Sequence, residues 1–307
     1  MDFRQLEAYV KVIELTSFSR AAEALFLSQP SVSTYITSLE KELGATLINR
    51  STKELSPTFA GKIFYENAKA LLTLKCNTIE RLKNLSGNLS GEIGVIASTV
   101  PSQYILPKII AGFNNSYPDI SFNVKQTDTF EVARGIASQK AEIGFSGGIE
   151  EDDKCEFKEF MTEKMVFIAP YSEEFSDAKE YSLEELLYKR RFVSREKGSG
   201  TRMQYESYFT EQNIKLGKIN TYAVFDNTQS IINAVMNGLG VSVVSELAAR
   251  VFIEQKMIIS LKLKTRLPER KLYYVLKKNF SHSHLVDLFI EFFINQQAKH
   301  PTQVLHT

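Results

Sequence analysis

A pair of short amphipathic helices, predicted on either side of a three-residue corner, constrains this 307-residue sequence more than any other feature. The first helix begins after Ser17 or Ser19, each of which suits an N-cap. The second begins after Ser28, and Pro30 falls in its first turn, where a missing N–H costs no hydrogen bond. Residues 17–36 therefore predict a helix-turn-helix.

Apolar side chains recur at helical spacing on both sides of this corner. A helix before it is predicted from the spacing of Leu6, Tyr9, Val10, Ile13 and Leu15. The helix after it is expected to bury Val32, Ile36, Leu39 and Leu43. Leu25 and Leu27 are expected to add to the same core, and Gly44 suits the left-handed position just past the last helix.

The exposed face of the third predicted helix is rich in hydrogen-bonding groups. A helix of this kind, placed in a DNA major groove, contacts base edges while neighbouring groups hold phosphates. We expect DNA contacts from Ser19, Arg20, Ser28, Gln29, Pro30, Ser31, Ser33, Thr34 and Tyr35. A solvated helix face is the alternative, and the alanine-rich helix and short corner before it favour DNA binding.

The charge of residues 1–61 argues against contact with nucleic acid, and its distribution weakens that objection. This segment carries six Lys and Arg against seven Asp and Glu, whereas nucleic-acid modules often have a basic excess. Its acids fall mostly on the first helix and at the far end of the third, and residues 27–37 carry none. Residues 62–89 are basic, with five Lys and Arg against two acids. The predicted contact segment is therefore free of acid.

A turn-rich segment and a long helix follow. Two short extended pieces around a polar turn, in residues 45–57, predict a wing whose Arg50 or Lys53 reaches phosphates or a minor groove. Thr58 then caps a helix that extends to about residue 85. Its apolar stripe consists of Phe64, Ala68, Leu71, Leu72, Ile79, Leu82 and Leu85. This stripe is expected to pack on a second copy of the chain, which provides two recognition helices for two half-sites.

These residues, in this order, resemble the LysR-type family of bacterial transcription regulators. The matching positions are Phe3-Arg4-Gln5-Leu6, Ser17-Phe18-Ser19-Arg20-Ala21-Ala22, Leu27-Ser28-Gln29-Pro30-Ser31-Val32-Ser33, Ile36, Leu39-Glu40, Leu43-Gly44, Leu47, Arg50 and Ala60-Gly61. The sequence departs from the family at Ile48-Asn49, where a Phe and a variable residue are usual, and at Phe59, which is often Pro. The resemblance implies a sequence-specific DNA-binding regulator.

From Gly91 onward short apolar strands alternate with helices. Strands are predicted at residues 91–97, 120–124, 141–145, 165–169, 191–193, 240–244 and 271–276, with a helix over about 103–115. Such alternation predicts a mostly parallel sheet covered by helices, and the last strand is expected to return to the first subdomain. The region resembles the two-lobed periplasmic-binding-protein fold that LysR-type regulators use as effector domains.

Three strand-to-helix junctions, at residues 98–102, 194–202 and 226–229, are rich in polar side chains. Ligands of open α/β sheets bind at the carboxyl ends of strands, where helix N-termini favour anions. We expect a small, anionic effector to contact Ser98, Thr99, Ser102, Gln103, Ser146, Arg195, Ser199, Thr201, Arg202 and Thr228. Helix capping is the alternative role for these side chains, and the carboxylate of Asp226 would repel an anion. The stretch Gly198-Ser199-Gly200-Thr201-Arg202 resembles a loop in sulfur- and selenium-related branches of the family.

Other classes of protein find less support. No run approaches the roughly 18 apolar residues of a membrane span, and the N-terminus lacks the apolar core of a secretory signal. Cys76 and Cys155 are too few for a disulfide framework, so a reducing cytoplasm is expected, and a redox pair of these cysteines is the alternative. The lack of a secretory signal and the N-terminal module argue against an exported binding protein. The four histidines have no carboxylates at metal-ligand spacing, and no nucleophile elbow occurs. We expect no enzyme activity, metal or cofactor.

These patterns predict three parts of the chain. They are a winged helix-turn-helix over residues 1–58, a linker and dimerisation helix over 59–88, and an effector-binding domain over 89–307. Lobe I of this domain is predicted over about 89–161 and 267–300, and lobe II over about 162–266. The expected assembly is a homodimer or homotetramer on a partly palindromic promoter in the cytoplasm, with RNA polymerase as a further partner. An α/β enzyme or small-molecule-binding protein without a role on DNA is the alternative.

Overall fold

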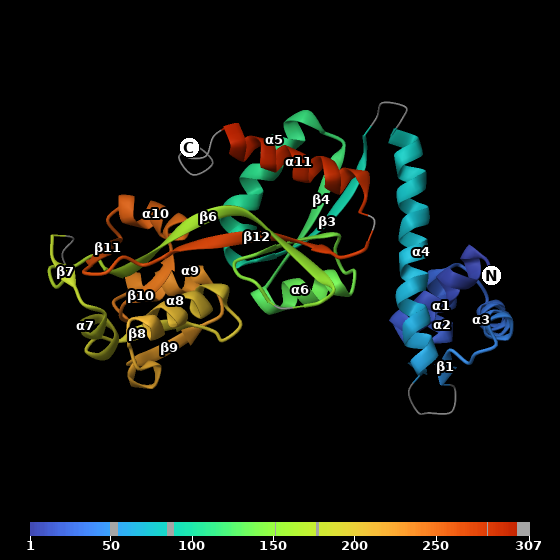
Figure 1. The fold of residues 1–307 in the computed structure, drawn as a ribbon, viewed down its shortest axis with the longest axis horizontal. Helices are drawn as coiled ribbons and strands as arrows, with labels where there is room; N and C mark the ends of the chain where they lie inside the picture. The colour runs from blue at the N-terminus through green and yellow to red at the C-terminus, as the bar shows by residue number, and fades with distance from the viewer. Residues whose placement is uncertain (50–54, 85–88, 151, 176–177, 281, 300–307) are drawn as a thin grey trace. The chain divides into compact units, whose positions relative to one another are not determined.

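The computed structural model describes residues 1–49, 55–84, 89–150, 152–175, 178–280 and 282–299 (Figure 1). It forms two compact units, which divide between residues 87 and 88. Arg50 and Lys53, which were predicted to contact DNA, lie outside the described residues, as does Leu85 of the predicted apolar stripe.

The N-terminal unit is a helical core followed by a small β-hairpin and a long helix. Its elements are α1 (Phe3–Leu15), α2 (Phe18–Ala24), α3 (Gln29–Leu43), β1 (Ile48–Asn49), β2 (Ser56–Pro57) and α4 (Phe59–Asn84). The two short strands are antiparallel, with Ile48 opposite Pro57. The predicted winged helix-turn-helix with a long helix after it is confirmed.

Side-chain caps fix where the helices of this unit begin. Ser17, rather than Ser19, accepts the backbone N–H of Arg20 at the start of α2. Ser28 accepts the N–H of Ser31 at the start of α3. α3 ends at Gly44 in the left-handed conformation, with φ of 64°, where glycine carries no steric penalty.

The core of the unit lies among α1, α2 and α3. Val32, Ile36 and Leu39 of α3 are fully buried, as predicted. The prediction was wrong for Leu43 and Leu27, which are 41% and 38% exposed. Leu43 is the last residue of α3, and Leu27 lies in the corner between α2 and α3, so neither joins the core among the three helices.

Part of the apolar stripe of α4 packs within the chain, and part of it is exposed. Ala68 is buried against α1, next to Leu6 and Val10, and the ring of Phe64 packs edge-on against Tyr9 at 5.2 Å between centroids. The expectation that the whole stripe faces a second copy is therefore corrected for its first half. A second set of apolar side chains on α4 is at least 40% exposed: Ile63, Leu71, Leu74, Ile79 and Leu82.

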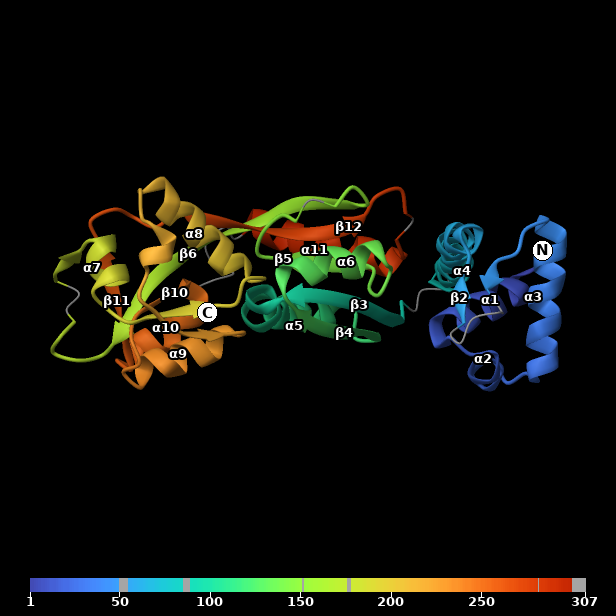
Figure 2. The same ribbon diagram turned by 90° about the horizontal axis from the view of Figure 1, so that it is seen from below.

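The C-terminal unit consists of two lobes, and lobe I is a sheet covered by helices on both faces. Its elements are β3 (Gly91–Ser98), η1 (Pro101–Ile105), α5 (Leu106–Ser116), β4 (Ile120–Thr127), α6 (Thr129–Ala137), β5 (Ile143–Ser146), the first part of β6 (Cys155–Pro170), most of β12 (Glu269–Lys277) and α11 (His284–Lys299). Helices α5 and α11 cover one face of the sheet, and α6 covers the other (Figure 1, Figure 2).

Lobe II repeats this layered arrangement with its own core. Its elements are β7 (Glu180–Tyr181), α7 (Leu183–Tyr188), β8 (Phe192–Arg195), α8 (Gly200–Glu211), η2 (Leu216–Lys218), β9 (Thr221–Phe225), α9 (Thr228–Met236), β10 (Ser242–Ser245), α10 (Glu246–Glu254) and β11 (Ile258–Leu263), with the end of β6. Helices α7 and α8 pack on one side of β6 and β10, and α9 and α10 pack on the other.

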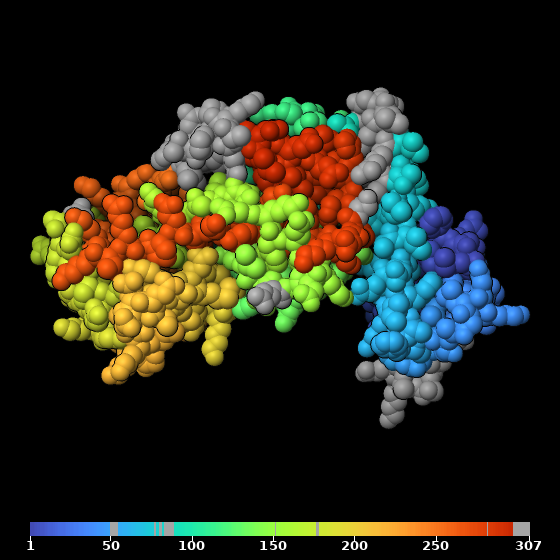
Figure 3. All heavy atoms as spheres, in the orientation of Figure 1, coloured from blue at the N-terminus to red at the C-terminus, as the bar shows by residue number. Residues whose placement is uncertain are grey.

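Two strands join the lobes. The first part of β6 pairs with β12, and residues 165–170 of the same strand pair with β10 and β11 of lobe II. In the space-filling view, yellow-green atoms of β6 and orange atoms of β12 adjoin on the visible face between the lobes (Figure 3). The last strand thus returns to lobe I, as predicted, because β12 also pairs with β5.

The expectation of a mostly parallel sheet holds only in part. β3 is parallel to β4 and β5, β8 to β9 and β7 to β11, but β12 runs antiparallel to β5 and β6, and β10 and β11 run antiparallel to β6. The antiparallel pairs arise because two long strands cross between the lobes in opposite directions. The sequence predicted only residues 165–169 of β6, because polar exposed residues alternate through its first half.

Candidate DNA-binding surface and effector cleft

Exposed polar side chains gather at the start of α3 and in the corner before it. Ser28, Gln29, Pro30 and Thr34 are exposed, whereas Ser31, Ser33 and Tyr35 are half-buried. Tyr35 packs partly against the core. Ser19 is exposed on α2 and donates a hydrogen bond to Gln29 Oε1 at 3.3 Å. The predicted contacts from α2 and α3 therefore border one surface.

Arg20 differs from the other predicted contacts because its guanidinium is already hydrogen-bonded. Its Nη2 donates to the carbonyl oxygen of Leu15 and, at 3.4 Å, to Thr16 Oγ1, at the C-terminal end of α1. A cation at a helix C-terminus is favourable because the carbonyl groups there carry partial negative charge. The side chain therefore stabilises α1 from an exposed position.

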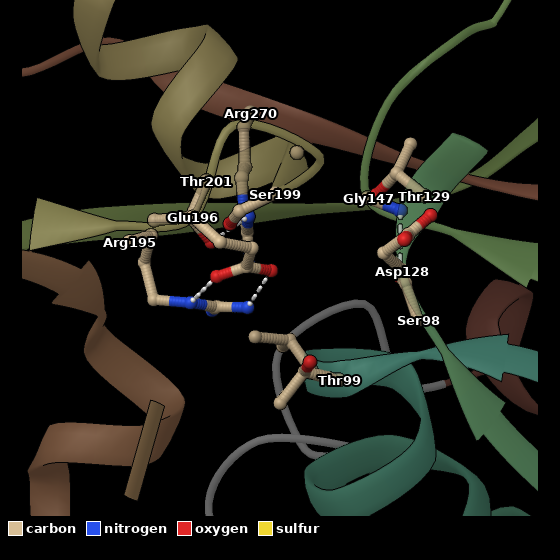
Figure 4. Close-up of a pocket in the computed structure, with 12 residues that line it drawn as sticks. Ser98, Thr99, Asp128, Thr129, Gly147, Arg195, Glu196, Ser199, Thr201 and Arg270 are labelled. Atoms are coloured by element: carbon tan, nitrogen blue, oxygen red, sulfur yellow. Dashed lines mark hydrogen bonds and ion pairs between the residues drawn. The ribbon is translucent and has the colours of Figure 1, made fainter. Parts of the chain in front are cut away.

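A cavity of about 10 Å³, room for a single water molecule, lies between the lobes of the C-terminal unit. Lobe I contributes Ser98, Thr99, Val100, Asp128, Thr129 and Gly147. Lobe II contributes Arg195, Glu196, Ser199, Gly200 and Thr201, and β12 contributes Arg270. Figure 4 shows the two groups facing each other across the cavity, with the Arg195 and Glu196 side chains paired within lobe II.

Half of the residues predicted for effector binding line this cavity. They are Ser98, Thr99, Arg195, Ser199 and Thr201. The structure does not bring Ser102, Gln103, Ser146, Arg202 or Thr228 to its lining. Ser102 is half-buried, Gln103 is exposed and donates to Gln126 at 2.9 Å, and the Ser146 hydroxyl donates to the Gly148 carbonyl at 2.6 Å.

The remaining two residues support the lining from behind. Thr228, at the start of α9, accepts a hydrogen bond from Arg195 Nη1 at 3.0 Å. Arg202 pairs with Glu206 at 2.7 Å and donates to the carbonyl of Arg195 at 2.8 Å. Ser199 and Asn227 also cap α8 and α9, so the capping alternative holds for these junctions alongside any contact with a ligand.

Sequence reasoning missed several lining residues. Asp128 and Thr129 lie at a strand-to-helix junction of the same kind as those predicted, and Asp128 caps α6. Glu196 was inside a predicted junction, but only its neighbours were chosen. Arg270 lies in a strand, where nothing in the local sequence distinguishes it from a solvent-facing cation. Asp226, expected to repel an anion, is exposed and outside the lining.

A buried ion pair lies directly behind the cavity, where β6 and β12 run side by side. Arg270 pairs with Glu163, which is opposite it on β6, and both side chains are 1% exposed. Ser245 donates to the same carboxylate, and Arg270 Nη1 donates to Thr201 at 2.8 Å. Burial raises the pKa of Glu163 above its ordinary value, and the Arg270 charge opposes that rise. Through Ser245 and Thr201 the pair holds lobe II to the crossing strands.

The two lobes touch each other beside the cavity through glycines. A Cβ on Gly200 of α8 would lie 3.0 Å from the carbonyl oxygen of Gly147 and 2.8 Å from Thr129 Oγ1, both in lobe I. Gln204 Nε2 donates to the same Gly147 carbonyl at 3.2 Å. The structure therefore has the lobes closed, which explains why the cavity is small.

A membrane-spanning helix and a metal-binding cluster are both absent from the described residues. No helix there combines the length and apolarity that crossing a bilayer requires. The described His, Cys, Asp and Glu side chains also form no group of three or more that would suit a metal ion.

A winged helix-turn-helix joined to a two-lobed α/β domain with a polar cleft defines a DNA-binding regulator that responds to a small ligand. Residues 3–62 match the model of the bacterial regulatory helix-turn-helix protein, lysR family, and residues 86–298 match that of the LysR substrate binding domain. The chain belongs to the LysR family of transcriptional regulators.

Relatives over the full length agree with this assignment. The HTH-type transcriptional regulator CysL of Bacillus subtilis (strain 168) is 31% identical over 290 residues, which are 94% of this chain and 96% of CysL. The RuBisCO operon transcriptional regulator of Allochromatium vinosum is 30% identical over 302 residues, 97% of each chain.

Solved structures share the fold. A full-length OxyR variant from Pseudomonas aeruginosa matches with a TM-score of 0.73 at 18% identity, over 99% of this chain and 96% of OxyR. The regulatory domain of Synechocystis PCC6803 CcmR, in complex with 2-PG, matches with a TM-score of 0.62 at 18% identity, over 67% of this chain and 97% of that domain.

Proposed function

We propose that this regulator binds promoter DNA through the first turn of α3, and that a small anion in the interlobe cleft changes the geometry of binding. The observation that carries the proposal is a single cavity lined from both lobes, since a ligand there contacts both lobes only when they are closed. A ligand shifts such an equilibrium by its differential affinity for the two states. Complexes of the same fold with 2-PG and with shikimate support a small-molecule ligand.

The proposed DNA contacts are those predicted from the sequence. Exposure of Ser28, Gln29, Pro30 and Thr34 supports base contacts from the start of α3, and Ser19 and Arg20 border the same surface. Ser31, Ser33 and Tyr35 are half-buried, which suits positioning against the DNA backbone. Arg50 and Lys53 remain proposed contacts of the wing.

The proposed effector site combines side chains that favour a small anion. Arg195 and Arg270 supply charge, and α8 begins at the cavity, where the first N–H groups of a helix carry partial positive charge. Ser98, Thr99, Ser199 and Thr201 add hydroxyls. The remaining predicted residues, Ser102, Gln103, Ser146, Arg202 and Thr228, are proposed to act by positioning this set.

The proposed assembly is a homodimer or homotetramer. The exposed apolar side chains of α4 support it, because a second copy would cover them and provide a second α3 for a second half-site. The domain division proposed is residues 1–58, 59–88 and 89–307, with the lobes divided near residues 161 and 266. RNA polymerase is a proposed partner at the promoter, and the cytoplasm, where the chromosome lies, is the proposed location.

We infer no enzyme activity for this chain. The charged side chains of the cleft are held in ion pairs and caps, and the family consists of transcriptional regulators. The alternative, a ligand-binding protein that does not bind DNA, does not account for the exposed first turn of α3.

The DNA-binding part is tested by selecting duplexes from a randomised pool with the full chain. Gln29→Ala should weaken binding to the selected sequence by about 5- to 150-fold, the effect of losing one good base contact. Lys41→Ala is the matched control, because this exposed residue lies about 18 Å further along α3. Recovery of no preferred sequence by the wild type, or equal binding by Gln29→Ala, would refute the proposed contacts.

The effector part is tested by adding small anions, among them sulfate, phosphate and selenite, to that protein–DNA complex. An anion that changes the footprint of the wild type should do so at about 2- to 10-fold higher concentration for Thr99→Ala, since one hydrogen bond is lost. Thr210→Ala is the matched control, because this exposed threonine lies near the C-terminal end of α8 and outside the lining. The cleft is the wrong site if the two variants respond alike.

A further inference from the structure

The two arginines of the cleft are paired with carboxylates of different kinds. Arg270 and Glu163 lie on neighbouring strands, and each side chain is 1% exposed. Arg195 pairs instead with Glu196, its neighbour in sequence, and the side-chain exposures are 4% and 26%. The first carboxylate is sealed inside the protein, whereas the second is partly exposed to solvent. Only the second can leave its partner by rotating its own side chain.

The guanidinium of Arg195 is held in place without help from Glu196. Its Nη1 donates to Thr228 Oγ1 at 3.0 Å, and its Nη2 donates to the carbonyl oxygen of Asp226 at 3.2 Å. Both partners belong to the junction between β9 and α9 in lobe II. Arg195 therefore keeps its orientation in the cavity when the carboxylate moves away.

Glu196 binds this guanidinium as a ligand carboxylate would. Its Oε2 accepts from Nε and its Oε1 accepts from Nη2, both at 2.8 Å (Figure 4). This bidentate geometry is the one by which arginine recognises carboxylates and other oxyanions. Both residues line the cavity, together with Thr99 of lobe I and the start of α8.

We propose that Glu196 is an intramolecular counter-ion that occupies the anion position beside Arg195 in the ligand-free regulator, and that an anionic effector must displace it. This inference rests on the proposed function of the cleft. An exchange of one oxyanion for another keeps the buried cation of Arg195 paired throughout, which avoids the large cost of a buried unpaired charge.

The counter-ion makes the cleft selective. A tethered carboxylate competes at a high effective concentration, so an anion that offers only the ion pair does not displace it. An effector must add contacts, for example with the hydroxyl of Thr99 or the first N–H groups of α8. The ligand class that fits is an oxyanion with a bidentate face and further hydrogen-bond acceptors.

The test measures binding of inorganic sulfate to the full chain, without DNA, by isothermal titration calorimetry. Glu196→Gln should bind sulfate at least about 10-fold more tightly than the wild type, because apparent affinity falls by the fraction of molecules whose site is free. Glu196→Asp, which keeps the charge, should stay closer to the wild type than Glu196→Gln does.

Glu206→Gln is the matched control. Glu206 pairs with Arg202 at 2.7 Å with a side-chain exposure of 30%, close to that of Glu196, but it does not line the cavity. Its sulfate affinity should equal that of the wild type. Adding Arg195→Gln to Glu196→Gln should abolish the gain, which locates the bound anion beside Arg195.

Equal sulfate affinity of Glu196→Gln and the wild type would overturn the proposal, as would a gain that survives in the double variant. If Glu196→Gln folds only when sulfate is present, the anion replaces the missing carboxylate and the proposal stands. If that variant is unfolded with and without sulfate, Glu196 is a structural partner and the proposal fails. These titrations are done without DNA, so their failure can be told apart from failure of the proposed function. The proposed function fails if no anion alters the footprint of the protein on DNA.

Discussion

At the scale of single residues, surroundings decide the chemistry of the two cysteines. Cys155 is 3% exposed, and its Sγ donates to the carbonyl oxygen of Ala133 at 3.3 Å. Burial, and after it the charge of Asp152, raises the pKa of this thiol to about 11. Because the thiolate is the reactive form, Cys155 is protected from oxidation at neutral pH. Cys76 is exposed on α4, so the two cysteines differ in access to reagents.

This contrast predicts selective alkylation of the folded chain. With iodoacetamide at pH 8, Cys76 should react at the rate of an exposed thiol, and Cys155 should react at least about 100-fold more slowly, since about one thiol in a thousand is ionised there. Raising the pH toward 11 should speed the Cys155 reaction. Cys76→Ser should remove the fast phase, and equal rates for both cysteines in mass spectra of digests would contradict the burial.

Single residues also mark where sequence reasoning about the site succeeds and fails. Ser199 and Thr201 were found because a strand followed by small polar residues and a helix is a local pattern. Arg270 was missed because its role depends on Glu163, 107 positions away in the sequence. Gly61 entered through family resemblance alone, and the structure supplies the reason: a Cβ there would lie 2.1 Å from the carbonyl oxygen of Leu47.

At the scale of elements, local signals predicted where helices begin better than which faces they bury. The caps Ser28 and Gly44 are where the sequence placed them, because a cap depends on the few residues around it. The faces of α4 were assigned to one partner, because a 3.6-residue period shows that a stripe is apolar but not what covers it. Contacts with α1 could come only from the fold.

The two faces of α4 should respond differently to substitution. Leu6→Ala, at the buried contact of α1 with α4, should lower the free energy of unfolding by about 2–5 kcal/mol, because it leaves a cavity. Leu82→Glu changes a side chain that is 63% exposed, so it should leave helix content unchanged and shift the oligomer toward monomer. Circular dichroism measures the unfolding of Leu6→Ala and the helix content of Leu82→Glu, and analytical ultracentrifugation measures the state of assembly. An unchanged assembly in Leu82→Glu would remove α4 from the proposed interface.

At the scale of the whole C-terminal unit, two lobes were predictable from the repeated alternation of strands and helices, but their closure was not. Closure depends on contacts between lobe I and α8 that involve the backbone of Gly147 and Gly200, where sequence gives no pattern. The crossing strands β6 and β12 set how the lobes pivot, and the Glu163–Arg270 pair holds those strands together at the cavity. A ligand that replaces Glu196 beside Arg195 therefore binds next to β6 and β12, the strands about which the lobes turn.

Gly200→Ala should hold the lobes apart. Its Cβ would meet Gly147 and Thr129 at 3.0 Å or less, and the backbone carbonyl among these atoms cannot move aside as a flexible side chain would. The lowest-cost response is opening at the pivot, with a loss of stability of about 1–3 kcal/mol where the lobes still touch. Spin labels at the exposed positions Lys140 of lobe I and Glu254 of lobe II, which lies outside α8, should report a longer distance by electron resonance.

Gly217→Ala is the control for this measurement, because nothing lies within 4 Å of the Cβ it would add. It should change neither the label distance nor the unfolding temperature. An unchanged distance in Gly200→Ala, together with lost stability, would mean that α8 shifts within lobe II and that the glycine contact does not control closure. A longer distance with weaker anion binding would tie the closed state to the ligand, because the cavity loses its lobe I wall when the lobes separate.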